Sequence, residues 1–186
     1  MDELMSAAEK LFLAKGVDST TINEIVEQAQ VAKGTFYHYF ASKNELLAAM
    51  GERYTAQFLN RLEEKINHCH ADDWLGRLCA WVQENIEAYA DTYRLHDIVY
   101  TNHHHHNRTN REKNAILEQL QAILESGTRT GVWYVAEPRI TSLLIYAGVH
   151  GATDDIIASP EADRQSFIRV VLADCLRMVG VSEHNA

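Results

Sequence analysis

The sequence predicts an all-α protein of about nine helices. Nearly every segment of the 186-residue chain repeats its apolar side chains with a helical period, and only two prolines interrupt it. No segment alternates apolar and polar residues convincingly, and the one β-like run, Val132–Val135, is too short to support a sheet. At this length the chain is expected to form one or two domains with a sizeable core.

Three short helices are expected at the N-terminus. An amphipathic stretch that includes Leu4 ends at Gly16, a residue typical of helix ends. Thr21-Ile-Asn-Glu24 is a capping-box pattern that predicts the start of a second helix, and a third opens at Ala32. Because only a tight turn separates the second and third helices, the arrangement is predicted to be a helix-turn-helix.

The rest of the chain is also expected to be helical. A second capping box, Ser42–Glu45, starts a long helix that reaches Ile66, and a loop at His68–Asp73 follows. The apolar periodicity predicts further helices over Trp74–Tyr89, Tyr93–Tyr100, Ala115–Glu125, Pro138–Ala158 and Glu161–Val179.

Charge and cysteine content narrow the class of protein. With 17 basic and 26 acidic residues the formal charge is −9, so any contact with nucleic acid must use a local patch. The N-terminus is acidic where a secretory signal would be basic, and no apolar run is long enough to suggest a membrane span. Three irregularly spaced cysteines suit reduced thiols, so we expect a cytoplasmic protein without membrane contact.

The stretch Val31–Leu46 differs from this acidic background. It holds two lysines, one histidine and four aromatic residues, and its only acid is Glu45. On a helix that opens at Ala32, Phe36 and Phe40 share one line and can pack inward. The pattern alone also fits a packed aromatic helix with an ordinary polar face.

The outer face of the same helix suits DNA. Lys33, Thr35, Tyr37 and His38 supply donors for phosphate oxygens and base edges, and no carboxylate repels them. Gly34 costs roughly 1 kcal/mol against alanine in a helix, and close approach of a DNA strand would explain it. Lys43 falls in the first turn of the next helix, where free amides also favour an anion.

Residues 6–50 resemble the DNA-binding domain of TetR-family transcriptional regulators. The resemblance rests on Lys-Gly-Thr-Phe-Tyr-His-Tyr-Phe at 33–40, followed by Ser-Lys-x-x-Leu at 42–46, after a threonine-capped helix. It implies a DNA-binding domain over residues 1–47 and a helical effector-binding and dimerisation domain over 48–186. The implied function is that of a homodimeric repressor, which a small-molecule effector releases from a palindromic operator.

The resemblance also implies roles for single residues. The implied contacts to double-stranded DNA are Thr21, Lys33, Gly34, Thr35, Tyr37, His38 and Lys43. Thr21 and Tyr37 would reach phosphates, and Lys43 would clamp the DNA backbone. Two positions depart from the family pattern: Gln30 stands where the turn usually has glycine, and Ala32 replaces the usual hydroxyl cap.

The second domain is expected to hold the effector and the dimer interface. The family places the interface on the last two helices, here Pro138–Ala158 and Glu161–Val179. The helices before them would enclose an effector pocket, lined by aromatic and histidine side chains of the second domain, although such a stripe also fits an ordinary core. The pocket candidates are Trp81, Tyr89, Tyr93, His96, Tyr100, Tyr146 and His150.

A run of histidines, His103–His106, allows an alternative. It fits a solvated loop, a metal site or a pH-responsive element. The alternative function is therefore a metal-responsive regulator or a metal-binding protein. No nucleophile motif, phosphate-binding glycine loop or His-Glu-x-x-His pair occurs, so neither an enzyme nor a cofactor is expected.

Overall fold

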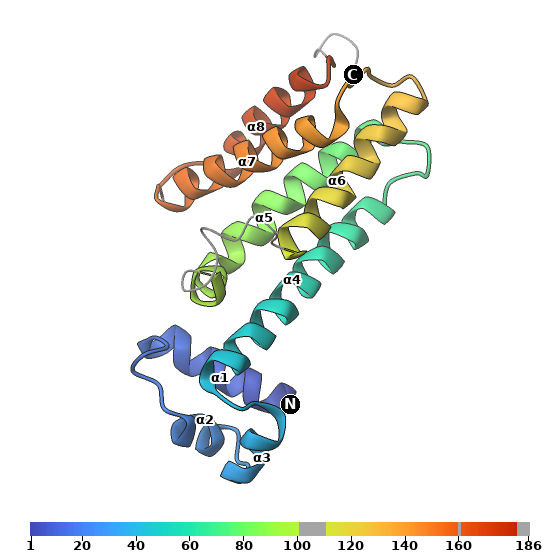
Figure 1. Ribbon diagram of the computed structural model, residues 1–186. Helices are drawn as coiled ribbons and strands as arrows, with labels where there is room; N and C mark the ends of the chain where they lie inside the picture. Colours follow the sequence, from blue (N-terminus) through green and yellow to red (C-terminus); the bar gives the residue numbers. More distant parts are fainter. Residues whose placement is uncertain (101–110, 160, 182–186) are drawn as a thin grey trace. The chain divides into compact units, whose positions relative to one another are not determined.

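The structure is a computed structural model that describes residues 1–100, 111–159 and 161–181 (Figure 1). These residues form eight α-helices and no strand, which confirms the predicted all-α class. The helices are α1 (Asp2–Lys15), α2 (Ile22–Gln28), α3 (Lys33–Tyr39), α4 (Lys43–Asn67), α5 (Trp74–Tyr100), α6 (Arg111–Arg129), α7 (Pro138–Ile157) and α8 (Arg164–Met178).

Two helix boundaries differ from the prediction. The two helices expected over Trp74–Tyr100 are one continuous helix, α5, because no proline or glycine interrupts the chain between Gly76 and Tyr100. The last helix begins at Arg164 rather than Glu161, because Asp163 caps it by accepting a hydrogen bond of 3.0 Å from the Gln165 amide.

The described chain divides into two compact units. The first combines residues 1–56 with the end of α5, from Thr92 to Tyr100, and the second combines residues 57–91 with the described residues from 111 onward. Both α4 and α5 therefore contribute to both units. The boundary expected after residue 47 falls within α4, which is continuous from Lys43 to Asn67.

The core of the first unit is built from the apolar faces that the periodicity predicted. Phe12 of α1 and Ile25 of α2 are buried, and so are Phe36 of α3 and Phe40, which follows it. The rings of Phe36 and Phe40 lie 5.8 Å apart between centroids, so the predicted inward line is confirmed. Leu46, Leu47 and Met50 of α4 close the same core.

The second unit buries apolar residues from the first half of α5. Trp81, Val82 and Ile86 are fully buried there, as are Leu120 and Leu124 of α6. The β-like run Val132–Val135 lies in the non-helical link between α6 and α7, where its Trp133 indole donates a 3.0 Å hydrogen bond to the Leu124 carbonyl. None of the described helices has the length and apolar character needed to cross a bilayer.

Candidate nucleic-acid interface

Helix α3 carries five of the seven predicted contact residues. Lys33, Gly34 and His38 are exposed, and Tyr37 has 52% of its surface exposed. Thr35 is partly buried, and the helix carries no acidic residue in its first turn. Tyr39, which the sequence analysis did not single out, is exposed as well, and its ring meets that of His38 at 4.9 Å. The surface therefore offers donors and aromatic rings without a competing carboxylate.

The turn before α3 shows both departures expected from the sequence. Gln30 has a φ of +55°, the one positive value at a non-glycine position among the described residues. A side chain in this region is disfavoured, which is why a glycine would fit better. Ala32 caps α3 without a side-chain hydrogen bond, as its methyl group dictates.

Gly34 is not required by packing within the chain. A Cβ atom at this position would meet no heavy atom of the described residues within 4 Å, outside the backbone of its own helix. The glycine therefore leaves the helix backbone uncovered at this point of the exposed face.

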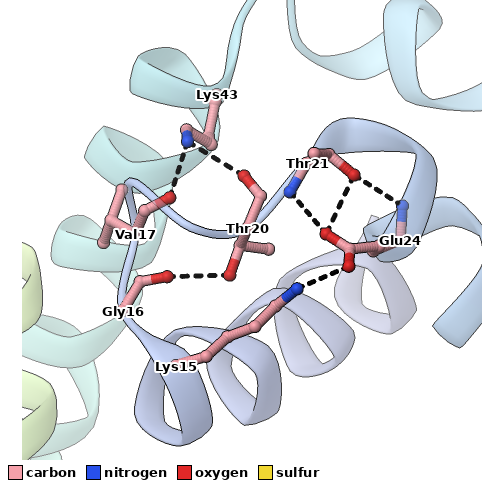
Figure 2. A network of polar contacts seen from close by, with 7 residues as sticks. All are labelled: Lys15, Gly16, Val17, Thr20, Thr21, Glu24 and Lys43. Carbon is pink, nitrogen blue, oxygen red and sulfur yellow. Dashed lines mark hydrogen bonds and ion pairs between the residues drawn. The ribbon is translucent and has the colours of Figure 1, made fainter.

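Thr21 lies in the capping box that the sequence predicted (Figure 2). Its hydroxyl accepts a hydrogen bond of 3.3 Å from the Glu24 amide, and its own amide donates to the Glu24 carboxylate at 2.8 Å. Lys15 pairs with the same carboxylate at 2.5 Å. The hydrogen bonds from Lys15 and Thr21 lower the pKa of Glu24 to about 2, so the acid stays ionised beside a lysine.

The second predicted capping box forms in part. The Ser42 hydroxyl accepts from the Glu45 amide at 3.2 Å, as expected. The Glu45 carboxylate, however, accepts from the amide of Ala41 rather than from that of Ser42. Both side chains therefore cap the first turn of α4. The bond to the Glu45 carboxylate comes from the amide one residue before the predicted donor.

Lys43 does not extend freely from α4. Its ammonium donates hydrogen bonds to the carbonyls of Val17, at 2.6 Å, and Thr20, at 2.9 Å, in the loop between α1 and α2 (Figure 2). The side chain is partly buried. The residue expected to clamp DNA thus holds a loop of its own unit.

The predicted effector residues do not come together in one place. Tyr93, His96 and Tyr100 belong to the first unit, whereas Trp81, Tyr89, Tyr146 and His150 belong to the second. Five of these residues lie along α5, where their spacing gave no sign of a division. Because α5 contributes to both units, the first two of the five belong to the second unit and the last three to the first.

In the first unit, the end of α5 packs on α4. The rings of His96 and Tyr100 lie 5.9 and 6.0 Å from that of Tyr54. The Tyr100 hydroxyl donates to the Gly51 carbonyl at 3.2 Å and is hydrogen-bonded to the Thr55 hydroxyl. These residues join the end of α5 to α4, the helix that follows α3 in the chain.

In the second unit, three rings stack between α5 and α7. His150 lies 4.2 Å from Tyr89 and 5.9 Å from Tyr146 between ring centroids. The Tyr89 hydroxyl donates to Asp154 at 2.6 Å, and burial raises the pKa of Tyr146. This group brings three of the seven predicted residues into one cluster.

Asn85 is a polar residue of this region that the sequence analysis missed. It is 2% exposed, and its amide nitrogen has no hydrogen-bond partner within the described part of the chain. It lies four residues from both Trp81 and Tyr89, on the same face of α5. An amide at helical spacing between two buried aromatic residues was the signal that could have found it.

The face of α7 opposite its core carries exposed apolar residues. Ile140 and Leu144 are more than half exposed, and Gly148 and Gly151 continue the same line with open space at each Cβ. Val170 and Met178 are exposed on α8. Exposed apolar side chains on two helices that pack against each other are typical of a contact surface.

The histidine run His103–His106 lies outside the described residues. In the remainder, no group of three or more His, Cys, Asp or Glu side chains is placed to hold a metal ion.

Comparison with known proteins identifies the N-terminal region. The family described as "Bacterial regulatory proteins, tetR family" matches residues 4–50. Over 88 residues the chain is 32% identical to the HTH-type transcriptional repressor NemR of Escherichia coli, covering 47% of this chain and 44% of that protein. An HTH-type transcriptional regulator of Bacillus subtilis, YvdT, is 36% identical over 73 residues, 39% of this chain and 37% of that protein. The chain matches less than half the length of these relatives.

Solved structures with this fold extend over the whole chain. FadR from Bacillus subtilis, in complex with stearoyl-CoA, has a TM-score of 0.73 at 19% identity and covers 96% of this chain and 97% of its own. The reduced form of E. coli NemR has a TM-score of 0.75 at 24% identity and covers 96% of each chain. At these identities the likeness shows the fold alone.

Proposed function

Because residues 4–50 match the TetR family of bacterial regulatory proteins, we propose that the chain is a sequence-specific DNA-binding transcriptional regulator of that family. It acts in the cytoplasm as a repressor that leaves a palindromic operator when a small-molecule effector binds. The observation that carries the proposal is the acid-free outer face of α3, exposed on a protein whose net charge is −9. Such a face presents donors to DNA where the rest of the surface repels it.

The residues of α3 divide by what they would contact. Lys33 and Tyr37 donate to phosphates, which fixes the position of the helix in the groove. Thr35 and His38 reach base edges and so determine which sequence is preferred. Gly34 lets a DNA strand approach the helix backbone, and Thr21 meets a phosphate at the start of α2.

Homodimerisation through α7 and α8 would bring two copies of α3 to successive major grooves, about 34 Å apart. The exposed apolar residues Ile140 and Leu144, with Gly148 and Gly151 beside them, support this interface. Two-fold symmetry of the protein then requires a palindromic site.

The effector would bind in the second unit, near Tyr89, Tyr146 and His150. A stack of three rings suits a flat organic molecule, and the unpartnered Asn85 amide suits a hydrogen-bond acceptor on it. We therefore infer an effector of medium size that combines an aromatic or conjugated part with a carbonyl or similar oxygen.

Selection of bound fragments from a random duplex DNA library, at two salt concentrations, tests the function. We expect recovery of a short palindrome whose affinity falls steeply as salt rises. The protein should also be denatured and refolded without small molecules before a second selection, which removes any effector carried through purification. Failure to enrich any sequence after that step would contradict the proposed function.

A further inference from the structure

The side chain of Lys43, the first residue of α4, forms hydrogen bonds within its own unit. Its ammonium lies between two backbone carbonyls, those of Val17 and Thr20, at 2.6 and 2.9 Å. Both acceptors precede it by more than twenty residues, so the contact is tertiary. Hydrogen bonds from a charged donor are about twice as strong as those between neutral groups.

The loop that Lys43 grips is closed by its own bonds. Thr20 is 1% exposed, and its hydroxyl donates to the Gly16 carbonyl at 2.8 Å. Its amide donates to the Val17 carbonyl at 3.2 Å. Gly16 has a φ of +84°, which reverses the chain as α1 ends. Lys43 therefore binds a compact turn rather than a loose segment (Figure 2).

This turn leads directly into Thr21, the cap of α2. A residue that fixes Thr20 also fixes where α2 begins relative to the start of α4. Helix α3 ends only a few residues before Lys43, at Tyr39. The ammonium thus connects the first residue of α4 with the loop that leads into α2, and α3 lies between these two points in the chain.

We infer that Lys43 is a positioning residue, which orders the α1–α2 loop for DNA binding instead of neutralising a phosphate. The inference rests on the proposed DNA-binding function. It replaces the phosphate clamp expected from the family resemblance, because two of the three donors of the ammonium are engaged within the chain.

Salt dependence separates the two roles. Each phosphate that a cationic side chain neutralises makes the slope of log affinity against log salt concentration about 0.9 more negative. For Lys43→Met we expect affinity for the selected operator to fall about tenfold at every salt concentration, the factor for about one lost contact, with the wild-type slope retained. The matched control is Lys33→Met, because the exposed Lys33 side chain is free to reach a phosphate. In this variant the slope should be about 0.9 less negative than in the wild type.

A double-mutant cycle with Thr21→Ala tests what Lys43 positions. If Lys43 places Thr21, the loss of affinity from Thr21→Ala should largely disappear in the Lys43→Met background. Two independent phosphate contacts would instead give additive losses. All variants should be compared at a temperature where circular dichroism shows them folded.

The wild-type protein provides a second measurement in case Lys43→Met does not fold. Nuclear magnetic resonance of the lysine ammonium groups, assigned with Lys43→Arg, should show the Lys43 signal protected in the free protein and unshifted by operator DNA. The inference would be overturned if Lys43→Met made the salt slope less negative and its loss of affinity added to that of Thr21→Ala. Unchanged operator affinity in Lys43→Met would also overturn it, as would a Lys43 ammonium signal that shifts when DNA is added. Absence of any salt-dependent binding by the wild-type protein would instead refute the proposed function itself.

Discussion

At the scale of single residues, substitution of Gly34 should affect stability and DNA binding in opposite directions. Its Cβ position is open, so Gly34→Ala should stabilise α3 by about 1 kcal/mol through helix propensity. The same methyl group would stand between the helix and an approaching DNA strand. We therefore expect a higher melting temperature together with weaker operator binding, measured by thermal unfolding and fluorescence anisotropy. Unchanged operator affinity would show that no DNA strand approaches this glycine.

Gly127 shows the opposite case, a glycine that packing requires. A Cβ atom there would overlap the indole of Trp133, which is itself buried and hydrogen-bonded to Leu124. Gly127→Ala should destabilise the protein by about 1–3 kcal/mol, because a buried indole cannot move aside freely. Gly51→Ala is the matched control, since its Cβ would make only ordinary contacts of 3.9 Å. Equal unfolding free energies for the two variants would contradict this account.

At the scale of elements, the cap of α2 makes stability depend on pH in the acid range. The pKa of Glu24 is lowered from 4.5 to about 2, because its carboxylate accepts hydrogen bonds from Lys15 and Thr21. A lowered pKa stabilises the folded state above the ordinary value, and this stabilisation is lost as the pH falls from 4.5 towards 2.

Glu24→Gln should therefore lower the free energy of unfolding at neutral pH. It should also make that free energy fall less steeply as the pH is lowered below 4.5. Urea unfolding between pH 7 and pH 3 measures this, and Glu27→Gln, an exposed position on the same helix, is the control. An acid limb as steep in Glu24→Gln as in the wild type would show that this carboxylate is not responsible.

The last two turns of α5 are an element that tertiary contacts bind to α4. Tyr100→Phe removes the hydroxyl that donates to Gly51 and pairs with Thr55, so a loss of roughly 1 kcal/mol is expected from denaturant unfolding. Since this contact links α5 to the helix that follows α3, we also expect effectors to release DNA less efficiently. Tyr93→Phe, earlier in the same helix, serves as the comparison, and an identical response in the two variants would rule out a specific role for the Tyr100 hydroxyl.

At the scale of the whole molecule, the apolar face of α7 predicts an obligatory dimer. Leu144 is 58% exposed in the single chain, and a charge placed there would be buried against a second copy. Leu144→Glu should therefore yield monomers in sedimentation velocity and abolish tight operator binding. Tyr134→Glu introduces the same charge at a side chain that is 81% exposed in the α6–α7 link, and it should leave the dimer intact. A Leu144→Glu protein that sediments as a dimer would place the interface elsewhere.

Local patterns in the sequence were sufficient for the all-α class, the capping box of α2 and the unfavourable turn at Gln30. Each depends on residues within about four positions of one another, where helix geometry and hydrogen bonding are determined by the chain itself. The exposed, acid-free face of α3 followed for the same reason, since the burial of Phe36 and Phe40 dictates which residues face outward.

Tertiary structure alone decided where Lys43 and the predicted pocket residues lie. A helical period shows which face of a helix is buried, but it does not show against which element. The ammonium of Lys43 therefore donates to carbonyls in a loop more than twenty residues earlier. Similarly, His96 and Tyr100 at the end of α5 lie in one unit, whereas Tyr89 of the same helix stacks with His150 in the other. These contacts join residues far apart in the sequence, so only the packing of whole helices determines them.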